Sequence, residues 1–257
     1  QTCALPIFNH LFINSAEETK NGPLILFLHE ALGSIPQWKN FPEELCKKLN
    51  LEGLVYERTG HGHSPRFKSS RTSSYLHEYA LDELPEFLSE LELKNRKLIL
   101  VGHSDGGSIA LLFAKQYFRN VLSVITMAAH VINEPETIEG VNKGVLAYKE
   151  GKLAGLKKYH FDKTEELFFA WADTWRSSEF KNWSIEKDIS PLKMPSLILQ
   201  GELDQYGTVE QINGIKKAAG QNCEIQLIPN CGHHPHLENK IEVINLISKW
   251  CNEKLFS

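Results

Sequence analysis

The chain has 257 residues, a formal net charge of −4 at pH 7 and 42% hydrophobic residues, values typical of one globular domain or of one domain with an insertion. The absence of a block of Lys and Arg argues against a nucleic-acid partner. No apolar run approaches the roughly 20 residues that a membrane helix needs, so we expect no membrane association. The five cysteines are scattered without Cys-x-x-Cys spacing, which favours a cytoplasmic protein over a disulfide or zinc protein. The oligomeric state stays open.

The first seven residues, QTCALPI, resemble the translation of a sequencing-adapter oligonucleotide. We interpret residues 1–7 as a non-native leader and exclude them from the fold prediction. On this interpretation, the natural N-terminus and a first edge strand are missing.

Strand and helix patterns alternate along much of the chain. Short apolar or β-branched runs predict strands at 9–15 (an edge strand), 24–28, 53–56, 98–101, 121–127, 196–200 and 224–228. Helical patterns lie at 38–49, 75–93 (with a kink at Pro85), from 108 onward, 209–219 and 241–251. This alternation predicts an α/β fold with a mostly parallel, doubly wound sheet.

The alternation breaks between residues 131 and 187, where helical spacing dominates and three of the five Trp residues occur. We expect an inserted helical cap at 131–187, flanked by core segments 8–130 and 188–257. The aromatic side chains of the cap are more often packing residues than ligand contacts. Trp171 and Trp175 nevertheless remain candidates for a substrate pocket.

The segment 98–112, LILVGHSDGGSIALL, predicts a strand, a sharp turn and a helix, with Ser104 at the apex. Glycines on both sides of Ser104 allow the backbone to approach neighbouring elements, and the helix would aim its N-terminal N–H groups at the same place. On its own, this pattern also fits the glycine-rich turn of a nucleotide-binding domain.

Ser104, Asp204 and His233 each follow the carboxyl end of a predicted strand, the edge at which open parallel sheets build their sites. Their order of Ser, acid and His is the order expected for a nucleophile on such a turn. A Ser hydroxyl needs an imidazole to take its proton, and the imidazole needs a carboxylate to fix its tautomer.

Five segments together resemble the α/β-hydrolase family: LFLHEALGS, ERTGHGHS, GHSDGG, QGELDQYGT and NCGHHPHLE. The resemblance covers nearly the whole chain and implies the α/β-hydrolase fold, with Ser104 as nucleophile, Asp204 as acid and His233 as base. It also implies an oxyanion hole made by the backbone N–H groups of Ala31 and Asp105. Glu30 departs from the family pattern, which has Gly there, and is a further candidate for the substrate pocket.

Alternatives exist for several of these roles. His234 and His236 compete with His233 as the base, and Glu202 competes with Asp204 as the acid. His29, His61 and His63 could suggest a metal site, but no acidic ligand set accompanies them, so we predict neither a metal nor a cofactor.

The side chain of Asp105 leaves two interpretations open. In one, the carboxylate is structural and pairs with loop N–H groups or with a cation such as Arg58. In the other, it faces the pocket and pairs with a positive charge on the substrate.

The pattern predicts a serine esterase that cleaves a small ester, thioester or related carbonyl substrate through an acyl-enzyme. Hydrolysis or lyase cleavage of a C–C bond is an alternative, since similar triads in the family catalyse several reactions. A ligand-sensing protein with little turnover is a second alternative. Fold alone does not decide among them.

Overall fold

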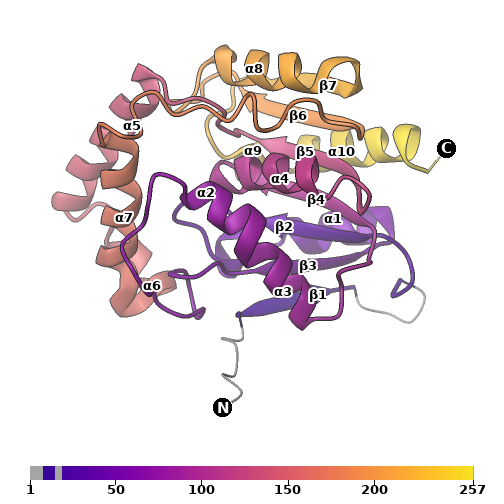
Figure 1. Ribbon diagram of the computed structural model, residues 1–257, viewed down its shortest axis with the longest axis horizontal. Helices are drawn as coiled ribbons and strands as arrows, with labels where there is room; N and C mark the ends of the chain where they lie inside the picture. Colours follow the sequence, from indigo (N-terminus) through magenta and orange to yellow (C-terminus); the bar gives the residue numbers. More distant parts are fainter. Residues whose placement is uncertain (1–7, 15–18, 257) are drawn as a thin grey trace.

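The computed structural model describes residues 8–14 and 19–256 (Figure 1), so the leader interpreted at 1–7 lies outside the described residues. Its strands are β1 (His10–Ile13), β2 (Leu24–Leu28), β3 (Glu52–Tyr56), β4 (Leu98–His103), β5 (Val121–Met127), β6 (Ser196–Gly201) and β7 (Cys223–Ile228). They form one sheet in the order β1-β3-β2-β4-β5-β6-β7. β1 pairs antiparallel with β3, and the other neighbouring strands pair in parallel. The mostly parallel sheet and the edge position of β1 confirm the predicted fold class.

Helices cover both faces of the sheet, which explains why its central strands are apolar on both sides. The helices are α1 (Phe41–Leu49), α2 (Tyr75–Glu78), α3 (Leu84–Glu90), α4 (Asp105–Gln116), α5 (Pro135–Lys149), α6 (Lys157–His160), α7 (Thr164–Arg176), α8 (Val209–Ala219), α9 (Pro235–Glu238) and α10 (Lys240–Lys254). In β2, Leu24 and Leu26 belong to the same buried cluster as side chains of α4 and α8. The intervening Ile25 packs with side chains of α1 and α10 on the opposite face.

Two helices differ from their predicted ranges. The helix expected from residue 38 begins at Phe41, after a 3-10 turn (Ile35–Trp38) and a residue with φ of 54°, Lys39. The helix expected over 75–93 contains a π-helical turn, Tyr79–Glu83, between α2 and α3. This wide turn directly precedes the predicted kink at Pro85, where proline cannot donate a backbone hydrogen bond.

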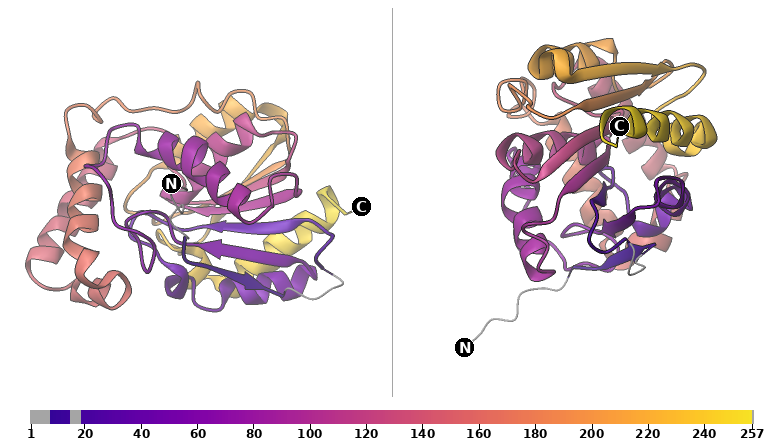
Figure 2. Two further views of the ribbon diagram at one scale, coloured as in Figure 1. Left: turned by 60° about the horizontal axis from the view of Figure 1, so that its bottom comes forward. Right: turned by 90° about the vertical axis from the view of Figure 1, so that its right-hand side faces the viewer.

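Helices α5, α6 and α7 stand together beyond one end of the sheet, at the left of Figure 1 and of the left view in Figure 2. Between residues 131 and 187, the structure also contains two 3-10 turns (Ala154–Leu156 and Phe161–Lys163) and one isolated bridge, from Ile132 to Ser184. All of this segment is described, and no strand runs through it.

The turn between β4 and α4 is tighter than the sequence suggested, because β4 extends to His103 and α4 begins at Asp105. Ser104 alone links the two elements and adopts φ 53° and ψ −120°, a strained conformation for a residue with a side chain. A Cβ atom on Gly106 would lie 1.9 Å from the carbonyl oxygen of Leu28, and one on Gly102 would lie 2.3 Å from that of Gly106. The glycines flanking Ser104 are therefore required by close backbone contact, as predicted.

This contact yields a stability prediction. Gly106→Ala should destabilise the fold by about 3 kcal/mol or more, because the obstructing atoms belong to the backbone of β2 and cannot move aside. Gly155→Ala is the matched control, since a Cβ atom there meets nothing within 4 Å. Urea unfolding measures both variants. An equal, small effect of the two substitutions would contradict the steric account.

Candidate active site

The structure brings Ser104, His233 and Asp204 into one chain of contacts, although they lie on different loops. The Oγ atom of Ser104 is 3.0 Å from Nε2 of His233, and Nδ1 of His233 is 2.8 Å and 2.9 Å from the two carboxylate oxygens of Asp204. Ser104 is 6% exposed, so the contacts form in a largely dry environment. These distances suit proton transfer from a hydroxyl to an imidazole that a carboxylate orients.

The carboxylate of Asp204 is itself held in place. It accepts hydrogen bonds from the backbone N–H of Tyr206 (2.9 Å) and from the side-chain amide of Gln200 (2.6 Å). Burial opposes its negative charge, but His233, His130 and the N–H of Tyr206 keep the pKa of Asp204 below its ordinary value. Burial likewise opposes a positive charge on His233, yet the Asp204 carboxylate raises the pKa of His233 above its ordinary value. The pair therefore stabilises a protonated imidazole.

The competing residues lie elsewhere. The ring of His234 is partly exposed and lies 4.0 Å from Glu238. His236 is buried against Trp38, with ring centroids 4.8 Å apart. Glu202 is exposed. Of the residues considered from sequence, His233 contacts Ser104, and Asp204 contacts His233. No such hydrogen bond joins His234, His236 or Glu202 to Ser104 or His233 in the described part of the chain.

The two predicted oxyanion donors lie on the loop after β2 (Ala31) and at the start of α4 (Asp105). Ala31 and Asp105 line the same cavity as Ser104. Asp105 is the first residue of α4, so its N–H has no carbonyl partner within the helix. No hydrogen bond in the described part of the chain uses the N–H of Ala31.

A buried arginine binds the carbonyl groups of the loop after β2. The guanidinium of Arg58, which is fully buried, donates to the carbonyl oxygens of His29 (2.6 Å) and Glu30 (2.8 Å). The carbonyl of Glu30 and the N–H of Ala31 belong to one trans peptide, so they point in opposite directions. Arg58 therefore fixes the Ala31 N–H to point away from itself.

Two histidines also contact carbonyl groups of the loop after β2. Nε2 of His61 lies 3.0 Å from the carbonyl oxygen of Ala31. His160, at the end of α6, lies 2.8 Å through Nε2 from the carbonyl oxygen of Leu32, and its Nδ1 accepts from the N–H of Gly62 at 3.1 Å. The segment 131–187 is thereby joined directly to the loop that carries Ala31.

The histidines considered for a metal site have other partners. His29 contacts the carbonyl of Glu30 through Nδ1 (2.7 Å) and the N–H of Arg58 through Nε2 (3.2 Å). His61 binds backbone carbonyls, and His63 is exposed. Among the residues that the structure describes, no group of three or more His, Cys, Asp or Glu side chains is arranged to hold a metal ion.

The carboxylate of Asp105 has a partner inside the protein, but this partner is not Arg58. It accepts a hydrogen bond from the hydroxyl of Tyr75 (2.8 Å), which in turn accepts from the indole N–H of Trp175 (2.9 Å). Burial raises the pKa of Asp105, while the charges of Arg58 and Arg71 act in the opposite direction. The arrangement favours the structural interpretation of this side chain and links the turn at Ser104 to helix α7.

The cavity over Ser104 is small, about 70 Å³ in volume. Glu30, Trp171 and Trp175, the three residues predicted for a substrate pocket, all line it. Trp175 also packs on Phe180 and Trp183, with centroids 4.9 Å and 5.4 Å apart. The Trp side chains therefore both stabilise the 131–187 segment and bound the cavity.

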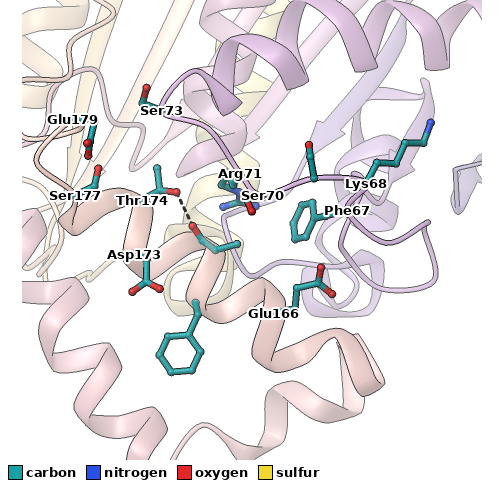
Figure 3. Close-up of a pocket in the computed structure, with 13 residues that line it drawn as sticks. Phe67, Lys68, Ser70, Arg71, Ser73, Glu166, Asp173, Thr174, Ser177 and Glu179 are labelled. Atoms are coloured by element: carbon teal, nitrogen blue, oxygen red, sulfur yellow. Dashed lines mark hydrogen bonds between the residues drawn. The ribbon is translucent and has the colours of Figure 1, made fainter.

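A wider cavity of about 670 Å³ lies away from Ser104, between the 67–73 segment and helix α7 (Figure 3). Its lining is mostly polar and includes Ser70, Arg71 and Asp173, but none of Ser104, Asp204 and His233. The larger cavity therefore lies apart from the contacts among Ser104, His233 and Asp204.

Several supporting residues had no distinct signal in the sequence. Tyr75, His160 and Gln200 reach the site from distant positions, and their residue types are common in ordinary helices and strands. Arg58 is considered from sequence only as a cation that could pair with Asp105, whereas the structure shows it bound to the carbonyl oxygens of His29 and Glu30. In the described part of the chain, no helix is both long enough and apolar enough to span a bilayer.

Comparisons with known proteins agree with the geometry. Mouse (Mus musculus) sn-1-specific diacylglycerol lipase ABHD11 is 25% identical over 89% of this chain and 80% of its own length. The 2-hydroxy-6-oxo-6-phenylhexa-2,4-dienoate hydrolase of Burkholderia cepacia is 29% identical over 56% of this chain and 58% of its own. The structure of a thermophilic esterase from Thermogutta terrifontis has a TM-score of 0.72 at 21% identity, covering 96% and 93% of the two chains. Residues 25–246 match the alpha/beta hydrolase family. This chain belongs to that family and is a hydrolase of the esterase and lipase type.

Proposed function

We propose that the protein hydrolyses a small ester, thioester or related carbonyl substrate through a Ser104-His233-Asp204 triad and an acyl-enzyme. The observation that carries this proposal is the continuous set of contacts of 3.0 Å and 2.8 Å from Ser104 through His233 to Asp204. The free N–H groups beside Ser104 support it, because an acyl transfer needs donors for the oxyanion.

In the first half of the reaction, Oγ of Ser104 attacks the carbonyl carbon while Nε2 of His233 takes the hydroxyl proton. The carbonyl oxygen becomes an oxyanion, which the N–H groups of Ala31 and Asp105 stabilise. His233 then gives its proton to the leaving alcohol or thiol as the carbonyl–heteroatom bond breaks. An acyl group remains on Ser104.

In the second half, water replaces the leaving group. His233 removes a proton from water, and the resulting hydroxide equivalent attacks the acyl carbon. Collapse of the second oxyanion releases the carboxylic acid and returns the proton to Ser104. No step needs a metal or an organic cofactor. The small cavity favours a short group on the side of the carbonyl that it encloses.

Cleavage of a C–C bond is the second candidate, because the Burkholderia relative is named as a hydrolase of a dienoate. The same triad could serve that reaction with a carbon leaving group. Product analysis separates the candidates, since ester hydrolysis releases an alcohol and a carboxylic acid, whereas C–C hydrolysis leaves no alcohol. Burst kinetics without steady turnover would instead favour a ligand sensor.

We further propose that 131–187 acts as a cap over core segments 8–130 and 188–257, a division supported by the helices α5 to α7 beyond the sheet. A cytoplasmic location is supported by Cys46, Cys223, Cys231 and Cys251, which are free and buried.

Ser104→Ala should remove nearly all turnover of short p-nitrophenyl esters, a loss on the order of 10³-fold or more, while the unfolding midpoint is kept. His233→Ala should lose a similar amount, and the double variant should be no slower than either single one, because the two residues act as a unit. Steady-state kinetics test both statements. Wild-type rates in Ser104→Ala would refute the proposed nucleophile.

The pH dependence follows from the raised pKa of His233. His233 must be neutral to accept the Ser104 proton, so kcat/KM should fall as the pH drops through a pKa above the ordinary value of 6.5. Asp204→Asn removes the charge that favours the imidazolium, and the NMR titration midpoint of His233 should therefore move down. Asp173→Asn, at an exposed position, should leave the midpoint in place. An unchanged midpoint in Asp204→Asn would contradict the assignment.

A further inference from the structure

A second cavity, of about 220 Å³, adjoins the cavity over Ser104. Glu30 and His234 line both cavities, so these two side chains form the boundary between them. The cavity over Ser104 alone holds about 70 Å³, well below the ~300–1,000 Å³ of ordinary ligand pockets. A substrate whose carbonyl reaches Ser104 must therefore extend beyond that cavity, and the second cavity offers the adjoining space.

Glu30 brings a negative charge to this boundary. No hydrogen bond or ion pair in the described part of the chain engages its carboxylate, although the residue is half-buried. The Glu30 charge adds to the larger effect of Asp204 in raising the pKa of His233. The pKa of Tyr206 rises to about 12, mainly through burial and next through the charge of Glu30. A partly desolvated carboxylate without a partner is costly, and a cationic ligand would offset that cost.

The walls of the second cavity are largely aromatic. Trp38, Tyr159, His103 and His236 all line it. Burial lowers the pKa of His103 and His236 well below the ordinary value, so both rings are neutral at pH 7 and do not balance the charge of Glu30. Indole and phenol rings attract ammonium groups through their π faces, most strongly where water is excluded.

Two lysines lie close to Tyr159: Lys158, whose ammonium group is 6.0 Å from the centre of the ring, and Lys39, which is exposed and lines this cavity. The ammonium group of Lys39 is 3.4 Å from the hydroxyl of Tyr159 and 5.8 Å from the centre of the same ring. In the described part of the chain, Lys39 makes no ion pair with Glu30; its ammonium group instead contacts Tyr159. The cavity therefore combines the unpaired Glu30 carboxylate with aromatic side chains, and Lys39 is the one lysine or arginine among the described residues that line it.

We propose that the second cavity binds an organic ammonium group of the substrate, with Glu30 supplying the opposite charge and Trp38 and Tyr159 the aromatic walls. On this assignment, the acyl group occupies the small cavity over Ser104, and the cationic alcohol extends past Glu30. The assignment rests on the proposed ester hydrolysis and adds to it the charge class of the leaving group.

The test compares acetylcholine with its uncharged carbon isostere, 3,3-dimethylbutyl acetate. The two esters share the acyl group and nearly the same shape, and the quaternary ammonium cannot lose its charge. For the wild-type protein, kcat/KM for acetylcholine should exceed that for the isostere by about tenfold or more at low ionic strength.

Substitutions at Glu30 test whether this residue causes the preference for the charged ester. Glu30→Gln should bring the ratio of the two kcat/KM values close to one, and Glu30→Asp should retain part of the preference. Glu210→Gln is the control, because it removes one negative charge at an exposed position of α8 outside both cavities. It should leave the ratio and the activity unchanged. A wild-type ratio near or below one, or a preserved ratio in Glu30→Gln, would overturn the proposal.

A separate measurement distinguishes this proposal from the proposed function. Turnover of p-nitrophenyl acetate reports ester hydrolysis without any cation, so its absence would count against the triad assignment. The ammonium site would then be judged by saturation-transfer NMR with choline and 3,3-dimethylbutanol. Choline binding to the wild-type protein that is lost in Glu30→Gln supports the site; absent or equal binding of the two alcohols refutes it.

Discussion

The close packing of Gly106 against the end of β2 is the constraint on which the site depends. The backbone at Gly106 lies so near the carbonyl groups of Leu28 and His29 that no side chain fits between them. The turn at Ser104, with its strained φ of 53° and ψ of −120°, lies two residues before this contact. The contact also places the start of α4 beside the loop that leaves β2, so the proposed nucleophile and both predicted oxyanion donors line one cavity.

Buried polar groups then hold that loop. Arg58 has no carboxylate partner in direct contact within the described structure and instead binds backbone carbonyls, an unusual use of a fully buried cation. His160 binds the next part of the loop, and Trp175 reaches Asp105 through Tyr75. Two separate hydrogen-bond connections therefore join the helices of 131–187 to the residues around Ser104. A movement of those helices would therefore shift the residues of the proposed oxyanion hole.

The sequence predicts the strands well because a parallel sheet buried on both faces needs continuous apolar runs, as in 24–28 and 121–127. It predicts helix interiors less well. The 3-10 turn before α1 and the π-helical turn before Pro85 depend on local backbone geometry that periodicity does not encode. The contact of Ser104 with His233 follows from strand ends sharing one sheet edge. The partner of Asp105 could not be predicted, because Tyr75 becomes its neighbour only through the packing of α2 against α4.

The central claim is that Ser104 is the nucleophile of this hydrolase, and peptide mapping after reaction with a fluorophosphonate tests it most directly. The probe forms a stable covalent bond with an activated Ser and reacts slowly with ordinary hydroxyl groups. The account predicts an adduct on the peptide that contains Ser104, which is lost when the protein is unfolded before labelling. An adduct on another residue, or none in a folded protein that turns over esters, would contradict it.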